Sequence, residues 1–222
     1  MVSRKHWQAR ASQYGNQPSG VLFSGLPDCL NRFVHAWHTS IIREWALSHV
    51  PPGGVLLDLG CGYGRIAVEI KREREDVQII GMDYIHDYCR YFSQSEAGLA
   101  VCGDLSQLPF RRGAFDCVVA VTTLMYLPQQ DFESVAGEIV QLLKPNGVVL
   151  FIDPTYEFIK FARMFRREKE QDRGTTGGSG FRLQEYRRLC SPENVECLAE
   201  GGNPGFTVLS PLLMLVGEGY TG

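Results

Sequence analysis

An aspartate and three glycines near the first quarter of the chain have the types and spacing of a ligand site. Asp58 lies in the apolar segment 55–59, and a G-x-G-x-G loop follows with Gly60, Gly62 and Gly64. Glycine lets a ligand approach the main chain closely, and the predicted helix after the loop offers unpaired N–H groups to an anion. The segment therefore predicts a ligand that meets bare main chain on one side and a fixed carboxylate on the other.

Two more aspartates follow at the ends of the next predicted strands. Asp83 lies nineteen residues beyond Gly64, where an acidic residue accepts hydrogen bonds from a ribose diol. Asp104 could accept from the exocyclic amine of adenine, with Leu105 beside the ring. A dinucleotide fingerprint would read G-x-G-x-x-G, and here the third glycine comes one residue early. The pattern favours a nucleoside ligand and disfavours a dinucleotide.

Strand and helix signals alternate through the middle of the chain, which predicts a parallel sheet covered on both faces. The strand candidates are continuous apolar runs, typical of strands buried on both faces, at 55–59, 77–82, 99–102, 116–121 and 147–152. The helix candidates between them are 63–73, 86–95 and 131–143. Before the sheet, periodicity predicts a short helix over 3–15 and a long amphipathic helix with Leu30, Phe33, Val34, Trp37, Ile41 and Trp45 on one face.

The order changes after the fifth strand candidate. We expect a helix over 155–173, a flexible glycine-rich loop at 174–180 and another helix over 181–190. Two closing strands are predicted at 195–199 and 208–216.

Composition sets the broad class. The chain has 222 residues, of which 44% are hydrophobic and 21% are charged, as expected for one globular domain. Its formal net charge of -3 disfavours nucleic acid as a partner. Seven scattered cysteines form no C-x-x-C pair, so we expect no metal site and a reducing, cytoplasmic location. We expect no signal peptide at the start and no membrane span, because no apolar run approaches about 20 residues.

The combined motifs resemble the class I (Rossmann-like) S-adenosylmethionine-dependent methyltransferases of the small-molecule type. The resemblance covers about residues 50–155 and rests on LLDLGCGYGR, GMD, GDLSQLPF, FDCVVAV and LLKPNGVVLF, in the order of the family. It implies an α/β three-layer sandwich with a seven-stranded, mostly parallel sheet whose last strand is antiparallel. A single domain would then comprise an N-terminal helical cap (1–50), a cofactor-binding core (51–154), and a lid after the fifth strand with the closing strands (155–222).

The resemblance also implies which residues bind S-adenosyl-L-methionine. The ammonium of its methionine part would meet Asp58, and its carboxylate would meet the helix N-terminus beyond Gly60. Asp83 would hold the ribose hydroxyls and Thr122 would lie below the sulfonium. The full predicted set is Tyr14, Asp58, Gly60, Cys61, Gly62, Asp83, Tyr84, Asp104, Leu105 and Thr122.

Candidates for acting on the acceptor are less constrained. His35 and His38 lie on the long amphipathic helix, where either could serve as a general base or simply be a structural histidine. Tyr126 follows the fourth strand, where it could face the methyl group or pack. Tyr14 could stack on the sulfonium through a cation–π contact or belong to the core.

The predicted reaction is methyl transfer to a small-molecule acceptor, on oxygen or nitrogen, by in-line displacement in which the protein mainly orients the acceptor. The alternatives within the class are C-methylation, as in quinone biosynthesis, and methylation of a tRNA or a protein. A tRNA or protein acceptor would gain weight if arginines of the predicted lid, Arg163, Arg166 or Arg167, proved essential. Alternatives outside the class are a nicotinamide-dependent oxidoreductase and a binding module without turnover. The product would be S-adenosyl-L-homocysteine, and we expect a monomer or a homodimer.

Overall fold

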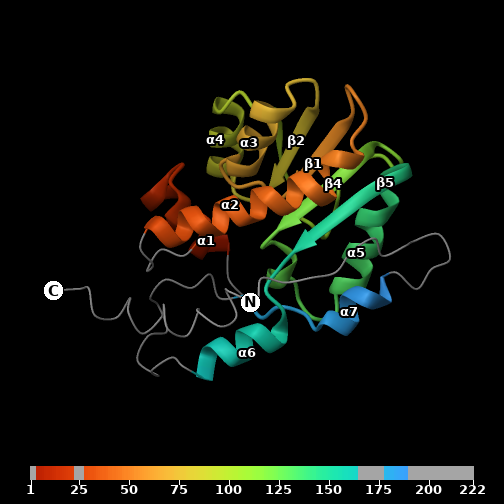
Figure 1. Cartoon of the computed structure of the whole chain (residues 1–222). Coiled ribbons are helices and arrows are strands. Elements are labelled where there is room, and N and C mark those ends of the chain that lie inside the picture. Colours follow the sequence, from red (N-terminus) through yellow and green to blue (C-terminus); the bar gives the residue numbers. More distant parts are fainter. Residues whose placement is uncertain (1–3, 23–27, 165–177, 190–222) are drawn as a thin grey trace.

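The computed structural model describes residues 4–22, 28–164 and 178–189, with the main chain alone at 161–164. Its centre is a five-stranded sheet in the order β3-β2-β1-β4-β5, and every neighbouring pair is parallel (Figure 1). The strands are β1 Val55–Leu59, β2 Gln78–Asp83, β3 Leu99–Cys102, β4 Phe115–Val121 and β5 Leu143–Ile152. The predicted α/β class and parallel sheet are thus confirmed for the described residues, which contain five of the seven expected strands.

Alternate residues of the central strands bury opposite faces of the sheet. Leu56 packs with residues of α2 Asp28–Trp45 and α3 Arg65–Glu73, whereas Leu57 and Leu59 pack with residues of α5 Phe132–Gln141. Both faces are therefore dry, which explains why these strands are apolar at almost every position. Because side chains alternate, Asp58 points to the same face as Leu56, toward α2 and α3.

The order of the strands reverses between β1 and β4, which are direct neighbours. In open α/β sheets, ligands bind outside the carboxyl ends of the strands at such a switch point. The segments that leave β1 and β4 therefore set the geometry of the site.

An N-terminal layer lies over this region. It consists of α1 Arg4–Tyr14, the short 3-10 helix η1 Pro18–Gly20 and α2. Trp7 and Ala11 of α1 are buried with Ile85 and Tyr88, beside α4 His86–Gln94. Figure 1 shows α2 running across the front of the sheet and α1 beside its N-terminal end. The two predicted N-terminal helices are confirmed, with the long one extending to Asp28.

The start of β5 differs from the sequence prediction. The expected strand begins at 147, but β5 begins at Leu143, where it pairs with Phe115, and the register then shifts so that Val148 pairs with Cys117. Asn146, with a φ of 64°, lies in the intervening turn. The connection between the predicted helix and the predicted strand is therefore an irregularity within the strand and not a loop before it.

Two short helices follow β5 in the described residues. These are α6 Tyr156–Met164 and α7 Leu183–Arg188. Gly178, Ser179 and Gly180 lie against the segment after β4, because the Ser179 and Gly180 N–H groups donate to the Met125 carbonyl at 3.1 and 3.4 Å. The predicted strands 195–199 and 208–216, like Arg166 and Arg167, lie outside the described residues.

Candidate cofactor and acceptor site

Asp58 is a buried carboxylate with an unused oxygen. Its residue is 2% exposed, and its Oδ2 has no hydrogen-bond partner among the described residues. Burial raises the pKa of Asp58 to about 7, with Arg65 opposing this rise and Asp83 adding to it. A buried polar atom without a partner costs about 1–3 kcal/mol, so the position is best explained by a donor that a ligand supplies.

The glycine loop approaches the end of β4 at van der Waals distance. Gly60 has a φ of +69°, and a Cβ built there would come within 2.3 Å of the Thr123 Oγ1 atom and 2.5 Å of its Cγ2. The Thr123 hydroxyl is held by the Leu59 and Val121 carbonyls at 3.0 and 3.1 Å. Only glycine fits at this position, because any side chain would meet both strain and a clash.

Thr122 has left-handed backbone, with a φ of 52°. Its N–H donates to the Ile152 carbonyl at 2.6 Å. A β-branched residue in this conformation costs on the order of 1–3 kcal/mol, and such strain is concentrated at functional sites. The strained residue therefore lies at the carboxyl end of β4, where the family resemblance implies that the sulfonium would lie.

Asp83 joins the glycine loop to the turn after β2. Its Oδ2 accepts from the Gly62 N–H at 3.0 Å and its Oδ1 accepts from the Ile85 N–H at 2.9 Å. Burial raises the pKa of Asp83 to about 6, and the main-chain donors oppose this rise. Each carboxylate oxygen accepts two hydrogen bonds, so capacity remains for ribose hydroxyls.

The candidates for the adenine end differ in exposure. Asp104 is exposed, and its Oδ1 accepts from the main chain and the hydroxyl of Ser106 at 2.9 and 2.8 Å. Leu105 is half-buried beside the α5-side core. Tyr84 lies under the guanidinium of Arg4, 6.0 Å from the ring centre, and burial raises its pKa to about 12.

The Cys61 side chain turns away from this surface into the core. The residue is 5% exposed and packs in the cluster on the α3 side of the sheet, and burial raises the pKa of its thiol well above the ordinary value. Its N–H, like that of Gly60, donates to the Met82 carbonyl, at 3.1 and 2.7 Å respectively. Any contact of Cys61 with a ligand would therefore involve its main chain.

Arg10 joins α1 to the η1 segment within the N-terminal layer. This residue is 6% exposed and donates to the Gly20, Ser19 and Leu22 carbonyls at 3.0, 2.5 and 2.6 Å. Tyr14 stacks on the Arg10 guanidinium at 5.7 Å. The arrangement holds η1 beside the glycine loop, because a Cβ at Gly62 would lie 2.9 Å from Val21.

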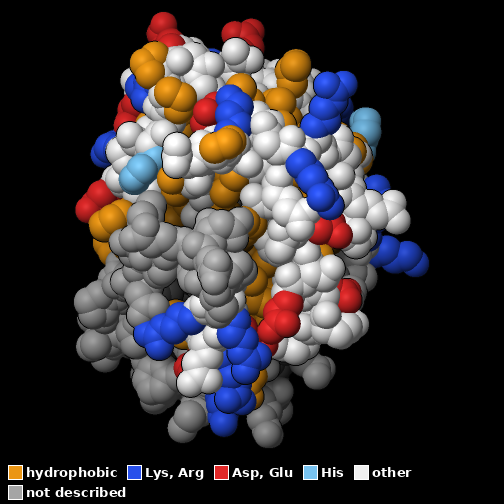
Figure 2. All heavy atoms as spheres, turned by 90° about the vertical axis from the view of Figure 1, so that its right-hand side faces the viewer, with side chains coloured by type: hydrophobic (Ala, Val, Ile, Leu, Met, Phe, Trp, Pro, Cys, Tyr) orange, Lys and Arg blue, Asp and Glu red, His pale blue; other side chains and the backbone are white. Residues whose placement is uncertain are grey.

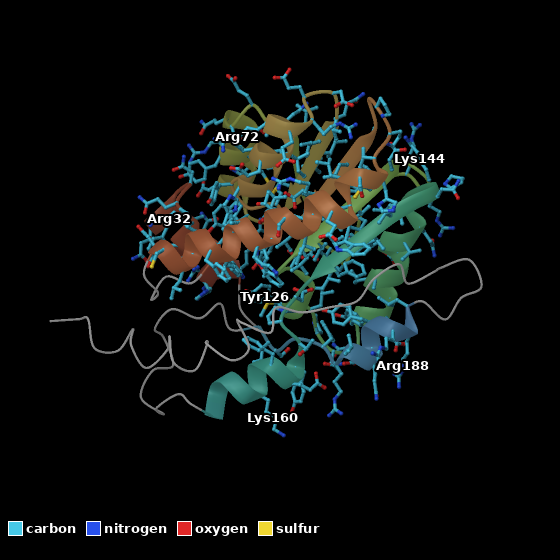
Figure 3. All side chains as sticks on the ribbon, in the orientation of Figure 1. Arg32, Arg72, Tyr126, Lys144, Lys160 and Arg188 are labelled. Atoms are coloured by element: carbon cyan, nitrogen blue, oxygen red, sulfur yellow. The ribbon has the colours of Figure 1, made fainter. Side chains whose placement is uncertain are left out.

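Tyr126 lies where the cap meets the segment after β5. Its ring contacts Trp7 of α1 edge to face, with 5.2 Å between centres, and a Cβ at Gly178 would lie 3.1 Å from its Cε1 atom. Figure 3 shows Tyr126 between α2 and α6. Of the three residues proposed to act on the acceptor, Tyr126 thus lies where three segments converge beyond the sheet.

His35 and His38 are brought together by one arginine. Arg65 donates to the Nδ1 atoms of His35 and His38 at 3.2 and 3.1 Å. The His38 residue is 3% exposed, and burial followed by the charge of Arg65 lowers the pKa of both histidines. Because arginine is only a donor, both Nδ1 atoms must accept and both rings are neutral.

Several residues of this region escaped the sequence analysis. Asp153 follows β5, and its carboxylate accepts from the Met125 N–H at 3.4 Å and the Tyr186 hydroxyl at 3.1 Å; burial raises its pKa to about 7. Arg10 lies on a helix with little amphipathic character. Arg65 did carry a signal, because a cation in the first turn of a helix opposes the helix dipole.

The site thus combines three groups: the Asp58 oxygen without a partner among the described residues, the main chain of the glycine loop, and the Asp83 carboxylate at the end of the neighbouring strand β2. These groups suit an ammonium, a carboxylate and a ribose, as S-adenosylmethionine carries. Among the described residues, no group of three or more His, Cys, Asp or Glu side chains could hold a metal ion. No helix in that part of the chain is long and apolar enough to cross a membrane.

Known proteins resemble the chain over this core. Residues 57–151 match a family model described as a methyltransferase domain. The sterol 24-C-methyltransferase erg6 of Schizosaccharomyces pombe is 34% identical over 106 residues, which are 45% of this chain and 27% of that protein. A carboxy-S-adenosyl-L-methionine synthase of Shewanella baltica is 31% identical over 150 residues, 62% of this chain and 59% of that protein. The matched region thus spans less than two thirds of either relative.

Solved structures share the fold at lower identity. A Haloferax volcanii protein solved in complex with the Trm112 methyltransferase activator has a TM-score of 0.61 and 20% identity, covering 84% of this chain and 75% of that one. The [4+2]-cyclase SpnF has a TM-score of 0.54 and 24% identity, covering 69% of this chain and 54% of its own. The fold therefore serves more than one reaction. Residues 57–151 therefore match the methyltransferase-domain family, and the motifs of this region resemble those of the class I, S-adenosylmethionine-dependent methyltransferases.

Proposed function

We propose that the protein transfers a methyl group from S-adenosyl-L-methionine to a small-molecule acceptor, on oxygen or nitrogen. The cofactor assignment rests on the buried Asp58 oxygen that has no hydrogen-bond partner among the described residues. This oxygen lies next to the glycine loop, in which no residue but glycine fits at position 60. An ammonium supplies the missing donor, and a ligand amide or hydroxyl would not balance the carboxylate charge. The domain match agrees with this choice.

Each proposed cofactor residue then has a distinct task. Asp58 holds the ammonium, Asp83 accepts from the ribose hydroxyls while bracing the loop, and Asp104 with Leu105 meets the adenine. When bound, the cofactor supplies an activated methyl group on a sulfonium. The chain contributes alignment, which can lower a barrier by about 7–11 kcal/mol at best. Thr122 and its neighbours form the surface of the site below the sulfonium, which positions the methyl group for this alignment.

The acceptor is proposed to lie beside Tyr126, under the segment that follows β5. Support comes from Trp7, whose ring contacts this tyrosine, and from Gly178, which lies against both Tyr126 and Met125. Asp153 lies at the same end of the sheet with a pKa near 7, which suits a base for an O–H or N–H acceptor. The proposed lid is the segment after the fifth strand, with Arg163, Arg166 or Arg167 as candidates for contact with an anionic group.

C-methylation is the second candidate. The named activity of the Schizosaccharomyces pombe relative is methylation of a sterol carbon, and the apolar and aromatic neighbours of Tyr126 would accept an apolar substrate. On such an acceptor the methyl transfer would come first and the loss of a proton from the resulting cation second, so a base such as Asp153 would act after the transfer and not during it. A tRNA or protein acceptor, or an activator protein such as the one bound by the Haloferax volcanii structure, remains a further alternative.

We also propose that 195–199 and 208–216 complete the sheet beyond β5, with the last strand antiparallel, within a single domain of residues 1–222. The support is that β5 is the outer strand of the described sheet and is mostly half-buried. Figure 2 views the molecule from this side, where hydrophobic side chains show between polar and basic ones.

The proposal is tested in two steps. Thermal melting with S-adenosylhomocysteine should raise stability, by about 2.7 kcal/mol at 100 times the dissociation constant. Transfer of a labelled methyl group to panels of phenols, carboxylates, amines and apolar acceptors then identifies the acceptor class. The absence of any stabilisation by S-adenosylmethionine or S-adenosylhomocysteine, together with stabilisation by NADH, would overturn the assignment.

A further inference from the structure

Arg65 is a partly buried cation that pairs directly with no carboxylate of the described residues. Burial lowers the pKa of its guanidinium, while Tyr63 and Asp58 oppose this effect through space. Its described hydrogen-bond partners are the neutral rings of His35 and His38. No carboxylate of the described residues lies within ion-pair distance, 4.0 Å, of this guanidinium. Taking a cation out of water without an anion is costly, so its position calls for an explanation.

Arg65 and Asp58 lie on the same side of the sheet. Asp58 points toward α2 and α3, where Leu56 packs with Ile66, the residue after Arg65. The two charges affect each other's pKa values, yet the Asp58 Oδ2 atom makes no hydrogen bond to the guanidinium. The folded chain thus keeps a cation and an anion near each other without a hydrogen bond between them.

A separated pair of this kind is complementary to a zwitterion. A ligand ammonium would supply the donor that Asp58 lacks, and a ligand carboxylate would supply the anion that Arg65 lacks. Arginine suits this task because the planar guanidinium can donate two parallel hydrogen bonds to a carboxylate. The hydrogen bonds from the Arg65 Nη1 and Nη2 atoms to His35 and His38 fix the orientation of the guanidinium.

We infer that Arg65 is the residue that recognises the carboxylate of the amino-acid tail of the cofactor, with His35 and His38 as positioning residues. The inference rests on the proposed use of S-adenosylmethionine and adds to it a side chain for the anion that the main chain alone was expected to hold. It also assigns the histidines to the cofactor tail and away from the acceptor.

The test compares two ligands in calorimetric titrations of the whole chain. One is S-adenosylhomocysteine and the other is its decarboxylated form, which has a hydrogen in place of the carboxylate. The wild-type protein should prefer the carboxylate form by about 10- to 100-fold, the range for a hydrogen-bonded charged group. In Arg65→Met this ratio should fall toward 1, because the affinity for the decarboxylated ligand changes little.

Matched variants separate recognition from folding. Arg65→Lys keeps the charge and should retain part of the ratio, which also gives an answer if Arg65→Met fails to fold. His38→Leu should lower the ratio, and His38→Gln, which restores an acceptor, should recover part of it. Arg43→Met is the control, because Arg43 is an exposed arginine of α2 paired with Glu73, and its ratio should equal that of the wild type.

The outcomes are distinct. A ratio that stays at the wild-type value in both Arg65 variants overturns the inference while leaving the proposed function intact. A wild-type protein that binds both ligands equally also overturns it. If the wild type binds neither ligand, the proposed function fails together with the inference.

Discussion

The contact between the glycine loop and the end of β4 can be tested by adding one carbon atom. Gly60→Ala places a Cβ 2.3 Å from the Thr123 Oγ1 atom in left-handed backbone. The conformation costs a non-glycine residue about 1–2 kcal/mol, and overpacking typically costs about 1–3 kcal/mol more. The free energy of unfolding should therefore fall by about 2–5 kcal/mol.

Gly53→Ala is the matched control. Gly53 has the same φ of +69°, but a Cβ there meets no atom within 4 Å. It should therefore lose only the conformational part, about 1–2 kcal/mol. Urea denaturation followed by circular dichroism measures both variants, and the difference between them isolates the clash at about 1–3 kcal/mol.

A double variant tests the identity of the clashing side chain. Thr123→Ala removes the Oγ1 and Cγ2 atoms and leaves only its Cβ, 3.0 Å from the added atom. Gly60→Ala with Thr123→Ala should be less destabilised than the sum of the single changes, by a coupling of about 0.5–3 kcal/mol. Equal losses for Gly60→Ala and Gly53→Ala, or strict additivity in the cycle, would refute the close approach.

Three further predictions concern the site. Asp83→Asn should weaken S-adenosylhomocysteine binding at least about tenfold and lower the free energy of unfolding by about 1–3 kcal/mol, because one amide oxygen cannot replace the two carboxylate oxygens that accept from the Gly62 and Ile85 N–H groups. Calorimetry measures the affinity and urea denaturation the stability. Unchanged affinity would remove the ribose assignment. Arg10→Met should speed amide hydrogen exchange in α1 and η1 but not in α5, since it removes three hydrogen bonds from the guanidinium to main-chain carbonyls. Equal protection in mass spectrometry would show that Arg10 does not hold α1 to η1. Because burial raises the pKa of Asp153 to about 7 in the folded chain, against about 3.9 when unfolded, its contribution to stability should be fully present below about pH 3.9 and be lost as the pH rises through about 7. Asp153→Asn should flatten that slope in urea titrations between pH 4.5 and 8, and an unchanged slope would contradict the shift.

The central strands and the glycine loop could be predicted because their signals are local. The apolar segment 55–59 and the alternating strand and helix signals after it predicted every described strand. The glycine at position 60 is explained by the lack of space for a side chain beside Thr123. Boundaries were less predictable where the register shifts, as at the start of β5.

The long-range contacts of the site could not be predicted from local patterns. His38 and Arg65 meet across 27 residues, and periodicity places His38 near an apolar stripe without saying which side chain of another helix faces it. The same holds for Asp153 and Tyr186, which are 33 residues apart. The sequence could offer histidines as general bases, whereas the hydrogen bonds to Arg65 give these rings a positioning role in our proposal.

The most direct test of the account is calorimetric titration of S-adenosylhomocysteine into the wild-type protein and Asp58→Asn at pH 7.5 and pH 6. The pKa of Asp58 is raised to about 7 by burial, so the carboxylate that meets the ammonium is lost as the pH falls through that value. The account predicts that the wild type binds at pH 7.5 and more weakly at pH 6, while Asp58→Asn binds weakly at both. No binding by the wild type, or equal affinity of the two proteins at pH 7.5, would contradict it.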